Sequence, residues 1–101
     1  MIESLASAIE RLGQRGFTRS LRAQDGSLRV VGTGRAHAPE DLSIDEIVRF
    51  EGETDPDEEL VLFALAGPDG RPVGTYTALF GPATPSEDAD VIPRLGGSRP
   101  A

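Results

Sequence analysis

The first segment of the chain repeats apolar residues with the period of an α-helix. Its large apolar side chains recur at spacings of three and four, which places them on one side of a helix. Gly16, shortly after them, suits the left-handed conformation that ends many helices. The pattern predicts a helix over residues 2–14, with Ile9 in the middle of its buried stripe. The stripe consists of Ile2, Leu5, Ile9 and Leu12.

The next two segments show the period of two that is typical of β-strands. Residues 17–23 and 27–31 are predicted as strands of a hairpin, because Asp25-Gly26 between them is a hairpin turn signal. Gly32-Thr33-Gly34 then predicts a turn, and residues 35–41 a loop or a single helical turn starting at Pro39. Alternation in the first strand puts Phe17, Arg19, Leu21 and Ala23 on one face and Thr18, Ser20 and Arg22 on the other.

The second half of the chain predicts three more strands. Residues 44–51 alternate, with Ile44, Val48 and Phe50 on one parity. Residues 60–66 are apolar on both parities, as expected of a central strand covered on two faces. The turn Gly67-Pro68-Asp69-Gly70 leads to a returning strand over residues 73–80, and Pro72, which lacks an N–H donor, belongs at its start. We expect the central strand to pair with both of the others.

A second, shorter helix is predicted near the C-terminus. Thr84-Pro85-Ser86-Glu87 has the form of a capping box with proline at the first helical position, so a helix should run from Pro85 to about Ile92 and stop at Pro93. The prediction is an α+β fold: an N-terminal helix packed on an antiparallel sheet of about five strands, followed by a short C-terminal helix. Residues 1–95 should form one domain and residues 96–101 a flexible tail.

Charge and composition narrow the functions open to the chain. The net charge of −7 argues against sequence-independent binding of nucleic acid. Residues 1–40 carry six arginines against four acids, a net of +2, whereas residues 41–101 carry four against thirteen, a net of −9. All ten basic residues are arginine. This usage reflects either a compositional bias of the genome or a preference for arginine in bidentate contacts with anions. The absence of cysteine excludes disulfides and thiolate zinc sites. The N-terminal segment has acids at Glu3 and Glu10 and no long apolar run, which predicts a cytoplasmic location.

Several short motifs give the chain a family resemblance. It resembles a family of small uncharacterised bacterial proteins of about this length, in which a helix ends in an RG(F/Y)T step and an IDE…RFEG…DP core follows. Genome annotations label some of these proteins phosphoribosylpyrophosphate synthetase, but this chain has neither lysine nor a GxxxxGK(S/T) loop for phosphates. The resemblance therefore implies a family and no function. The matching residues are Arg15-Gly16-Phe17-Thr18, Ile44-Asp45-Glu46, Arg49-Phe50-Glu51-Gly52, Asp55-Pro56, Phe63-Ala64-Leu65 and Gly81.

An acidic stretch over residues 51–59 holds six acids and no base. Its alternating carboxylates could surround a cation, but no register has the glycine and glutamate that an EF-hand loop requires. We interpret the stretch as a solvated turn whose geometry Asp55-Pro56-Asp57 sets. No metal site and no other cofactor is predicted.

Asp45, Arg49 and Glu51 form the candidate recognition patch, because they share one parity of the strand over residues 44–51. They are either a surface ion-pair ladder or a patch that recognises a peptide or a small polar ligand. No catalytic residue is assigned: His37, the single histidine, lies in a predicted loop, and no nucleophile elbow is present.

Two functions follow from these patterns. The first is a non-catalytic binding or regulatory module that meets another protein through an exposed sheet face or edge. The second is a small enzyme that uses the polar constellation of Asp45, Arg49 and Glu51. We favour the module, with a protein partner of unidentified kind and with neither nucleic acid nor a membrane. A flat or convex surface would support the module, and a deep pocket would support the enzyme.

Overall fold

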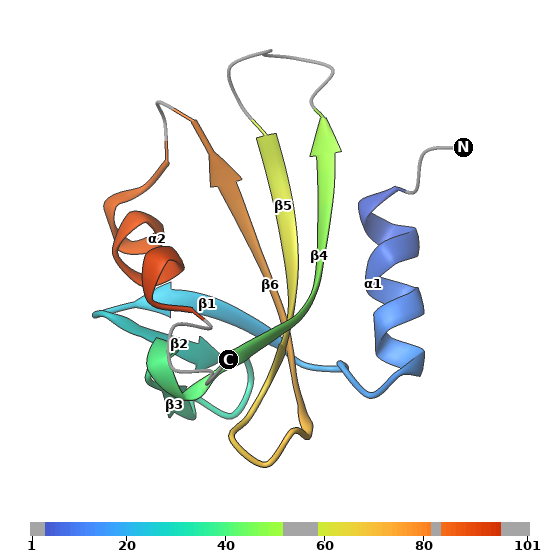
Figure 1. Cartoon of the computed structure of the whole chain (residues 1–101), viewed down its shortest axis with the longest axis horizontal. Coiled ribbons are helices and arrows are strands. Elements are labelled where there is room, and N and C mark those ends of the chain that lie inside the picture. The colour runs from blue at the N-terminus through green and yellow to red at the C-terminus, as the bar shows by residue number, and fades with distance from the viewer. Residues whose placement is uncertain (1–3, 52–58, 82–83, 96–101) are drawn as a thin grey trace, which may run out of the picture.

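The protein is an N-terminal helix, a six-stranded mixed sheet and a short C-terminal helix (Figure 1). The structure is a computed structural model that describes residues 4–51, 59–81 and 84–95. Two short 3-10 helices, η1 (Pro39–Asp41) and η2 (Ile92–Arg94), complete it. The other elements are α1 (Leu5–Gln14), β1 (Ser20–Gln24), β2 (Ser27–Val30), β3 (Ala36–His37), β4 (Ser43–Glu51), β5 (Glu59–Ala66), β6 (Pro72–Phe80) and α2 (Ser86–Val91).

Helix α1 confirms the predicted N-terminal helix and corrects its buried face. The Ser4 hydroxyl caps it by accepting a hydrogen bond from the Ser7 N–H at 3.1 Å. Ala8 and Leu12 are fully buried, whereas Ile9 is 41% exposed. The prediction that Ile9 lies in the buried stripe was wrong, because the small Ala8 side chain is the one that packs against β5.

The sheet has the strand order β3-β2-β1-β6-β5-β4. β1 runs parallel to β6, and all the other neighbouring strands are antiparallel. The expected α+β class is confirmed, but the expectation of about five antiparallel strands was wrong in two respects. The two-residue strand β3 was missed, and the parallel contact joins strands that are far apart in the sequence.

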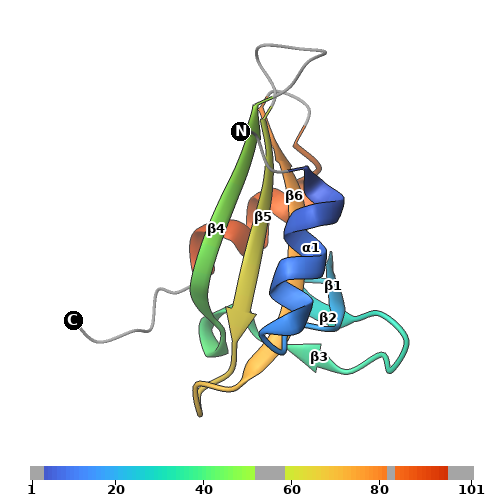
Figure 2. The same ribbon diagram turned by 90° about the vertical axis from the view of Figure 1, so that its right-hand side faces the viewer.

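The sheet separates two apolar cores, and β5 contributes to both. Its residues Leu62 and Ala64 pack with Ala8 and Leu12 of α1 on one face. Val61, Phe63 and Leu65 pack on the other face with Val91 of α2. In Figure 2 the two helices lie on opposite sides of the strands. The prediction of a central strand covered on both faces and paired with β4 and β6 is confirmed.

Two local predictions need correction. Phe17 packs in the core beneath α1, while Leu21 belongs to the core beneath α2, because β1 begins only at Ser20. At the other end of the chain, Thr84 does not cap α2: its hydroxyl accepts from the Gly81 N–H at 2.9 Å. The predicted C-terminal helix itself is present as α2, which ends before Pro93, and Pro93 lies in the following 3-10 helix η2.

Other predictions concern residues that the structure does not describe. These are most of the acidic stretch over residues 51–59 and the tail over residues 96–101. Within the described part of the chain, no helix is long and apolar enough to cross a membrane.

Candidate functional site

β4 is a nine-residue strand at the outer edge of the sheet. Among the described residues it hydrogen-bonds to β5 on one side and to no strand on the other. A strand in this position presents unpaired backbone N–H and C=O groups on its free side. The predicted recognition patch therefore lies on an edge strand, on which Asp45, Ile47 and Arg49 are exposed.

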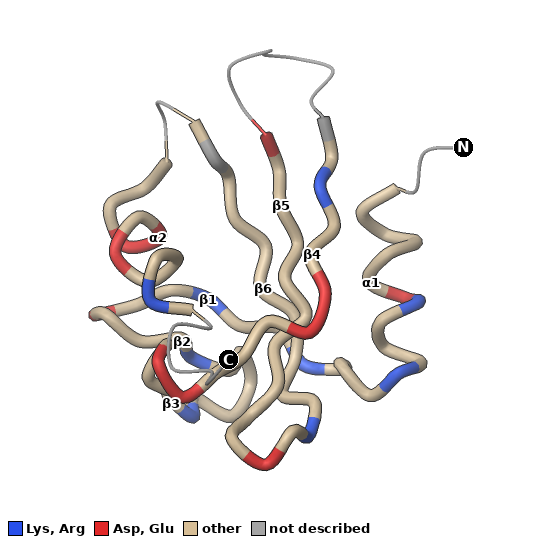
Figure 3. Tube along the Cα trace, viewed as in Figure 1, with Lys and Arg blue, Asp and Glu red and all other residues tan. Residues whose placement is uncertain are grey.

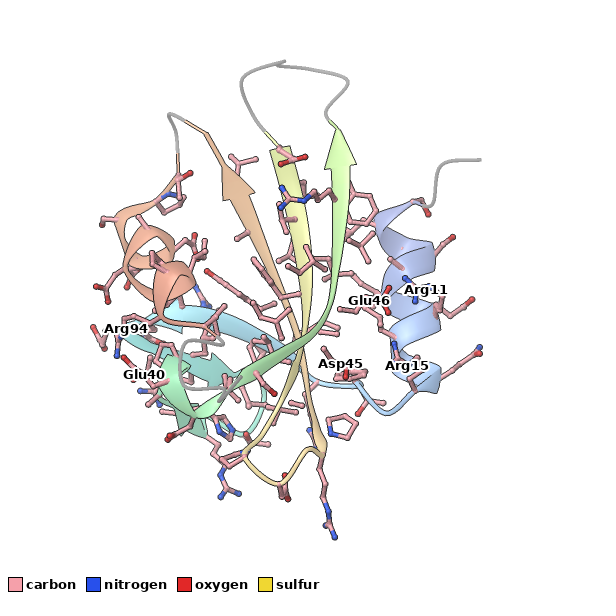
Figure 4. The ribbon with its side chains drawn as sticks, in the orientation of Figure 1. Arg11, Arg15, Glu40, Asp45, Glu46 and Arg94 are labelled. Atoms are coloured by element: carbon pink, nitrogen blue, oxygen red, sulfur yellow. The ribbon has the colours of Figure 1, made fainter. Side chains whose placement is uncertain are left out.

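A β-bulge between Ile44 and Glu46 breaks the alternation at the start of β4. Consequently Asp45 and its neighbour Glu46 both meet arginines of the helix side. Arg11 of α1 makes a two-point contact with the Glu46 carboxylate, with Nη···Oε distances of 3.2 and 2.7 Å. Arg15 bridges the two acids, at 2.8 Å from Glu46 and 2.7 Å from Asp45 (Figure 4).

This cluster of Arg11, Arg15, Asp45 and Glu46 fixes α1 to β4. The hydrogen bond from Arg11 is the main reason that the pKa of Glu46 lies below its usual value. Arg15 also lies over the ring of Phe17, with its guanidinium carbon 5.5 Å from the ring centroid. These ion pairs hold the helix in place against β4. The Asp45 carboxylate is therefore occupied by a contact within the protein.

Arg49 lies on the opposite face of the sheet from α1. It stands across from Val61, which belongs to the core on the α2 side. Its side chain is 57% exposed, and its Nη1 is 3.1 Å from the Glu59 carboxylate. Ile47, two residues before it, is 44% exposed. The free part of β4 thus offers one apolar and one cationic side chain next to each other.

The three residues of the predicted patch do not share their contacts. Asp45 pairs with Arg15, and Arg49 pairs with Glu59. Glu51 is placed opposite Glu59 in the strand register, and its side chain lies outside the described part. The bulge explains the separation, because alternation continues across a strand only while its register is regular.

A second ion-pair cluster, which the sequence analysis missed, surrounds Arg94 of η2. Its guanidinium pairs with Glu40 of η1 at 2.5 and 2.9 Å and with Asp90 of α2 at 3.2 Å (Figure 4). It also donates to the Gly26 carbonyl in the β1–β2 turn at 3.1 Å. The hydrogen bond from Arg94 lowers the pKa of Glu40. Glu40 and Arg94 are 54 residues apart, so no local sequence pattern could reveal this ion pair.

A third feature that was missed is a pair of arginines directly opposite one another. Arg22 of β1 and Arg29 of β2 are partners in the hairpin register. Neither forms an ion pair with an acid in the described part of the chain, and the buried Nε of Arg29 has no hydrogen-bond partner there. The sequence did contain a signal: a two-residue Asp25-Gly26 turn pairs Gln24 with Ser27 and hence Arg22 with Arg29.

Among the described residues, no group of three potential ligands could hold a metal ion. His37 lies in β3, opposite Leu28 of β2, rather than in the predicted loop. No protein-family model, no curated protein and no solved structure matches this chain, so the family resemblance stays a prediction.

Proposed function

We propose that this protein is a non-catalytic binding module that meets another protein through the exposed part of β4. The observation that carries the proposal is the free edge of this strand in the described structure, with exposed Ile47 and Arg49 beside it. An extended segment of a partner can add to such an edge as a further strand, bound by main-chain hydrogen bonds.

Backbone hydrogen bonds do not distinguish one partner from another, so specificity must come from the side chains of β4. Ile47 offers an apolar anchor, and Arg49 offers a planar cation that suits a carboxylate or a carbonyl of the partner. The bulge at the start of the strand and the charged residues along it also disfavour pairing between copies of the protein. These features favour binding of a specific partner over unspecific association.

The alternative function, a small enzyme acting through Asp45, Arg49 and Glu51, has less support. A general acid or base needs a carboxylate within hydrogen-bond reach of a substrate. The Asp45 carboxylate contacts Arg15, whereas Arg49 contacts Glu59 on the other face of the sheet. These contacts support a recognition role for Arg49 and a structural role for Asp45.

Affinity capture from a native lysate, with variants at β4, tests the proposal. Ile47→Ser and Arg49→Ala should abolish capture of a specific protein, while Arg71→Ala, which removes an exposed arginine in the β5–β6 turn, should leave capture intact. Arg49→Ala should change the free energy of unfolding by only about 0–1 kcal/mol, because its ion pair is exposed.

Two results with these variants would contradict the proposal. One is capture that survives both β4 substitutions while the variants stay folded. The other is unfolding by Arg49→Ala, which would make Arg49 a structural residue. Amide chemical-shift changes on adding the captured partner should cluster along β4, and changes confined to another surface would also oppose the proposal.

A further inference from the structure

The outer face of β1, β2 and β3 is a surface that the proposed function does not use. Leu21, Leu28 and Val30 point into the core beneath α2, so their strand neighbours Arg22 and Arg29 project from the opposite face. Helix α1 packs on that same face, but its core contacts come from β4 and β5. Figure 2 shows β1 to β3 extending beyond α1.

The side chains on this outer face are arginine or small and polar, with one alanine. Gln24 stands across from Ser27, and Arg29 lies between Arg22 on one side and Ala36 on the other. No acid of the described residues lies on these strands (Figure 3). Two like charges directly opposite each other destabilise a strand pair, so this arrangement works against the fold.

Arg29 is held in position for a contact. Its Nη1 donates to the Gly34 carbonyl at 2.7 Å, which ties the guanidinium to the β2–β3 turn. A guanidinium that is already fixed loses less freedom when it binds an anion than one on a free side chain.

We propose that this arginine face, formed by Arg22 and Arg29, binds an acidic segment of a partner protein. The support for this proposal is charge complementarity: neither arginine of the face has an ion pair with a described acid, although the chain as a whole has a net charge of −7. In a short extended acidic peptide, the carboxylates of every second residue point to the same side. Arg22 and Arg29 can each bind one of these carboxylates through two N–H donors.

A nucleic acid suits this face less well. A phosphate backbone longer than the patch would run onto surfaces of an acidic protein, and binding depends on neutralising many phosphates. The outer face of the three strands also has no aromatic side chain among its described residues on which a base could stack. An acidic peptide needs only a few cations within a short distance.

The test is fluorescence anisotropy with a labelled hexaglutamate peptide at low salt. The Arg22→Gln/Arg29→Gln double variant should bind the peptide at least about tenfold more weakly than the natural protein. The control is Arg71→Gln, which removes the same charge from the β5–β6 turn and should bind as the natural protein does. The double variant should stay folded, because removal of the like-charge pair offsets loss of the hydrogen bond from Arg29 to Gly34, and thermal melting checks this.

The binding results distinguish an acidic peptide from other possible ligands of the arginine face. Equal weakening by Arg71→Gln would mean that only net charge matters and would overturn the proposal. Absence of peptide binding by the natural protein would overturn it as well. A hexathymidine oligonucleotide, measured in parallel, should bind more weakly than the peptide, and tighter binding of the oligonucleotide would replace the acidic segment by a phosphate chain. None of these results depends on Ile47 or Arg49, so the proposal for β4 stands or falls separately.

Discussion

The phenol of Tyr76 on β6 donates a hydrogen bond to the carboxylate of Asp88 on α2. Tyr76 is almost completely buried, and its ring stacks on Phe63 of the adjacent strand with the centroids 5.8 Å apart. Burial is the main reason that the pKa of Tyr76 lies above its usual value, and the Asp88 carboxylate raises it further. This contact joins the short C-terminal helix to the larger of the two cores.

The raised pKa of Tyr76 predicts alkaline unfolding. Below the ordinary tyrosine pKa of 10.0 the phenol is protonated in both states, so its contribution to stability is complete. Above that pH the unfolded chain releases the proton more readily than the native protein, and stability falls. The chain has a single tyrosine, so tyrosinate absorbance reports on this group alone. The signal should rise only as the protein unfolds, and titration in the folded state near the ordinary pKa would contradict the burial.

The substitution Tyr76→Phe should lower the free energy of unfolding at neutral pH by about 1–3 kcal/mol, because Asp88 loses its hydrogen-bond donor. Urea denaturation measures the change. The variant should also lose the part of the alkaline destabilisation that belongs to this phenol. A variant as stable as the natural protein would show that the hydrogen bond adds nothing to the attachment of α2.

Two substitutions in α1 distinguish its buried side from its exposed side. Leu12→Ala should lower the free energy of unfolding by about 2–5 kcal/mol, because Leu12 is fully buried. Ile9→Ala should cost less than about 1 kcal/mol, since Ile9 is 41% exposed. Chemical denaturation of both variants gives the comparison, and equal losses would restore the original prediction that Ile9 is part of the core.

Gly74 marks the close approach of β6 to β1. A Cβ atom at this position would lie 2.4 Å from the Arg19 carbonyl oxygen and 2.8 Å from Leu21 Cδ1. Gly74→Ala should therefore force the strands apart and destabilise the protein by about 1–3 kcal/mol or more. Gly13 is a matched control, because a Cβ there meets nothing within 4 Å and Gly13→Ala should stabilise α1 by about 0.5–1 kcal/mol. Thermal melting of the two variants should shift in opposite directions.

The lowered pKa of Glu46 predicts a loss of stability in acid. Its ion pair with Arg11 contributes fully above the ordinary glutamate pKa of 4.5 and is lost as the pH falls through the lower native value. Glu46→Gln should therefore be less stable than the natural protein at neutral pH, and the difference should shrink at about pH 3. Glu10→Gln, an exposed position on α1, is the control and should change little. A difference that is the same at both pH values would mean that charge is not its cause.

Amide hydrogen exchange should be slowest in β5. This strand is paired on both sides, and Val61 to Leu65 are buried on both faces. Its amides can exchange only when the whole sheet opens. Exchange in β5 as fast as in the edge strand β4 would contradict this arrangement.

The sequence predicted most of the elements because their signals are local. Alternation located β4, a continuous apolar run located β5, the turn before it located β6, and helical spacing located α1. The bulge at Asp45 could not be foreseen, and it moved Asp45 away from the face that Arg49 occupies. Two other features depend on the path of the whole chain. These are the ion pair between Arg94 and Glu40 and the parallel pairing of β1 with β6. Local patterns specify a strand, whereas its non-sequential neighbours depend on packing.

The candidate site was predicted in the same partial way. The sequence identified β4 as the strand of interest and Arg49 as an outward residue on it, and the structure agrees with that placement. It gave no weight to Ile47, whose exposure results from its position near the free edge. The Arg22–Arg29 pair was within reach of sequence reasoning, since the turn sets the hairpin register.

The parallel contact between β1 and β6 also has a consequence for the order of folding. It is short, with Ser20 opposite Thr75 and Leu21 opposite Tyr76, and it joins two groups of strands that are each antiparallel neighbours in sequence. Closing the short loops within each group costs little entropy, whereas the β1–β6 contact closes a much longer one. We expect the two groups to form first and to join late. Substitutions along the β1–β6 contact should then speed unfolding and leave the rate of folding nearly unchanged.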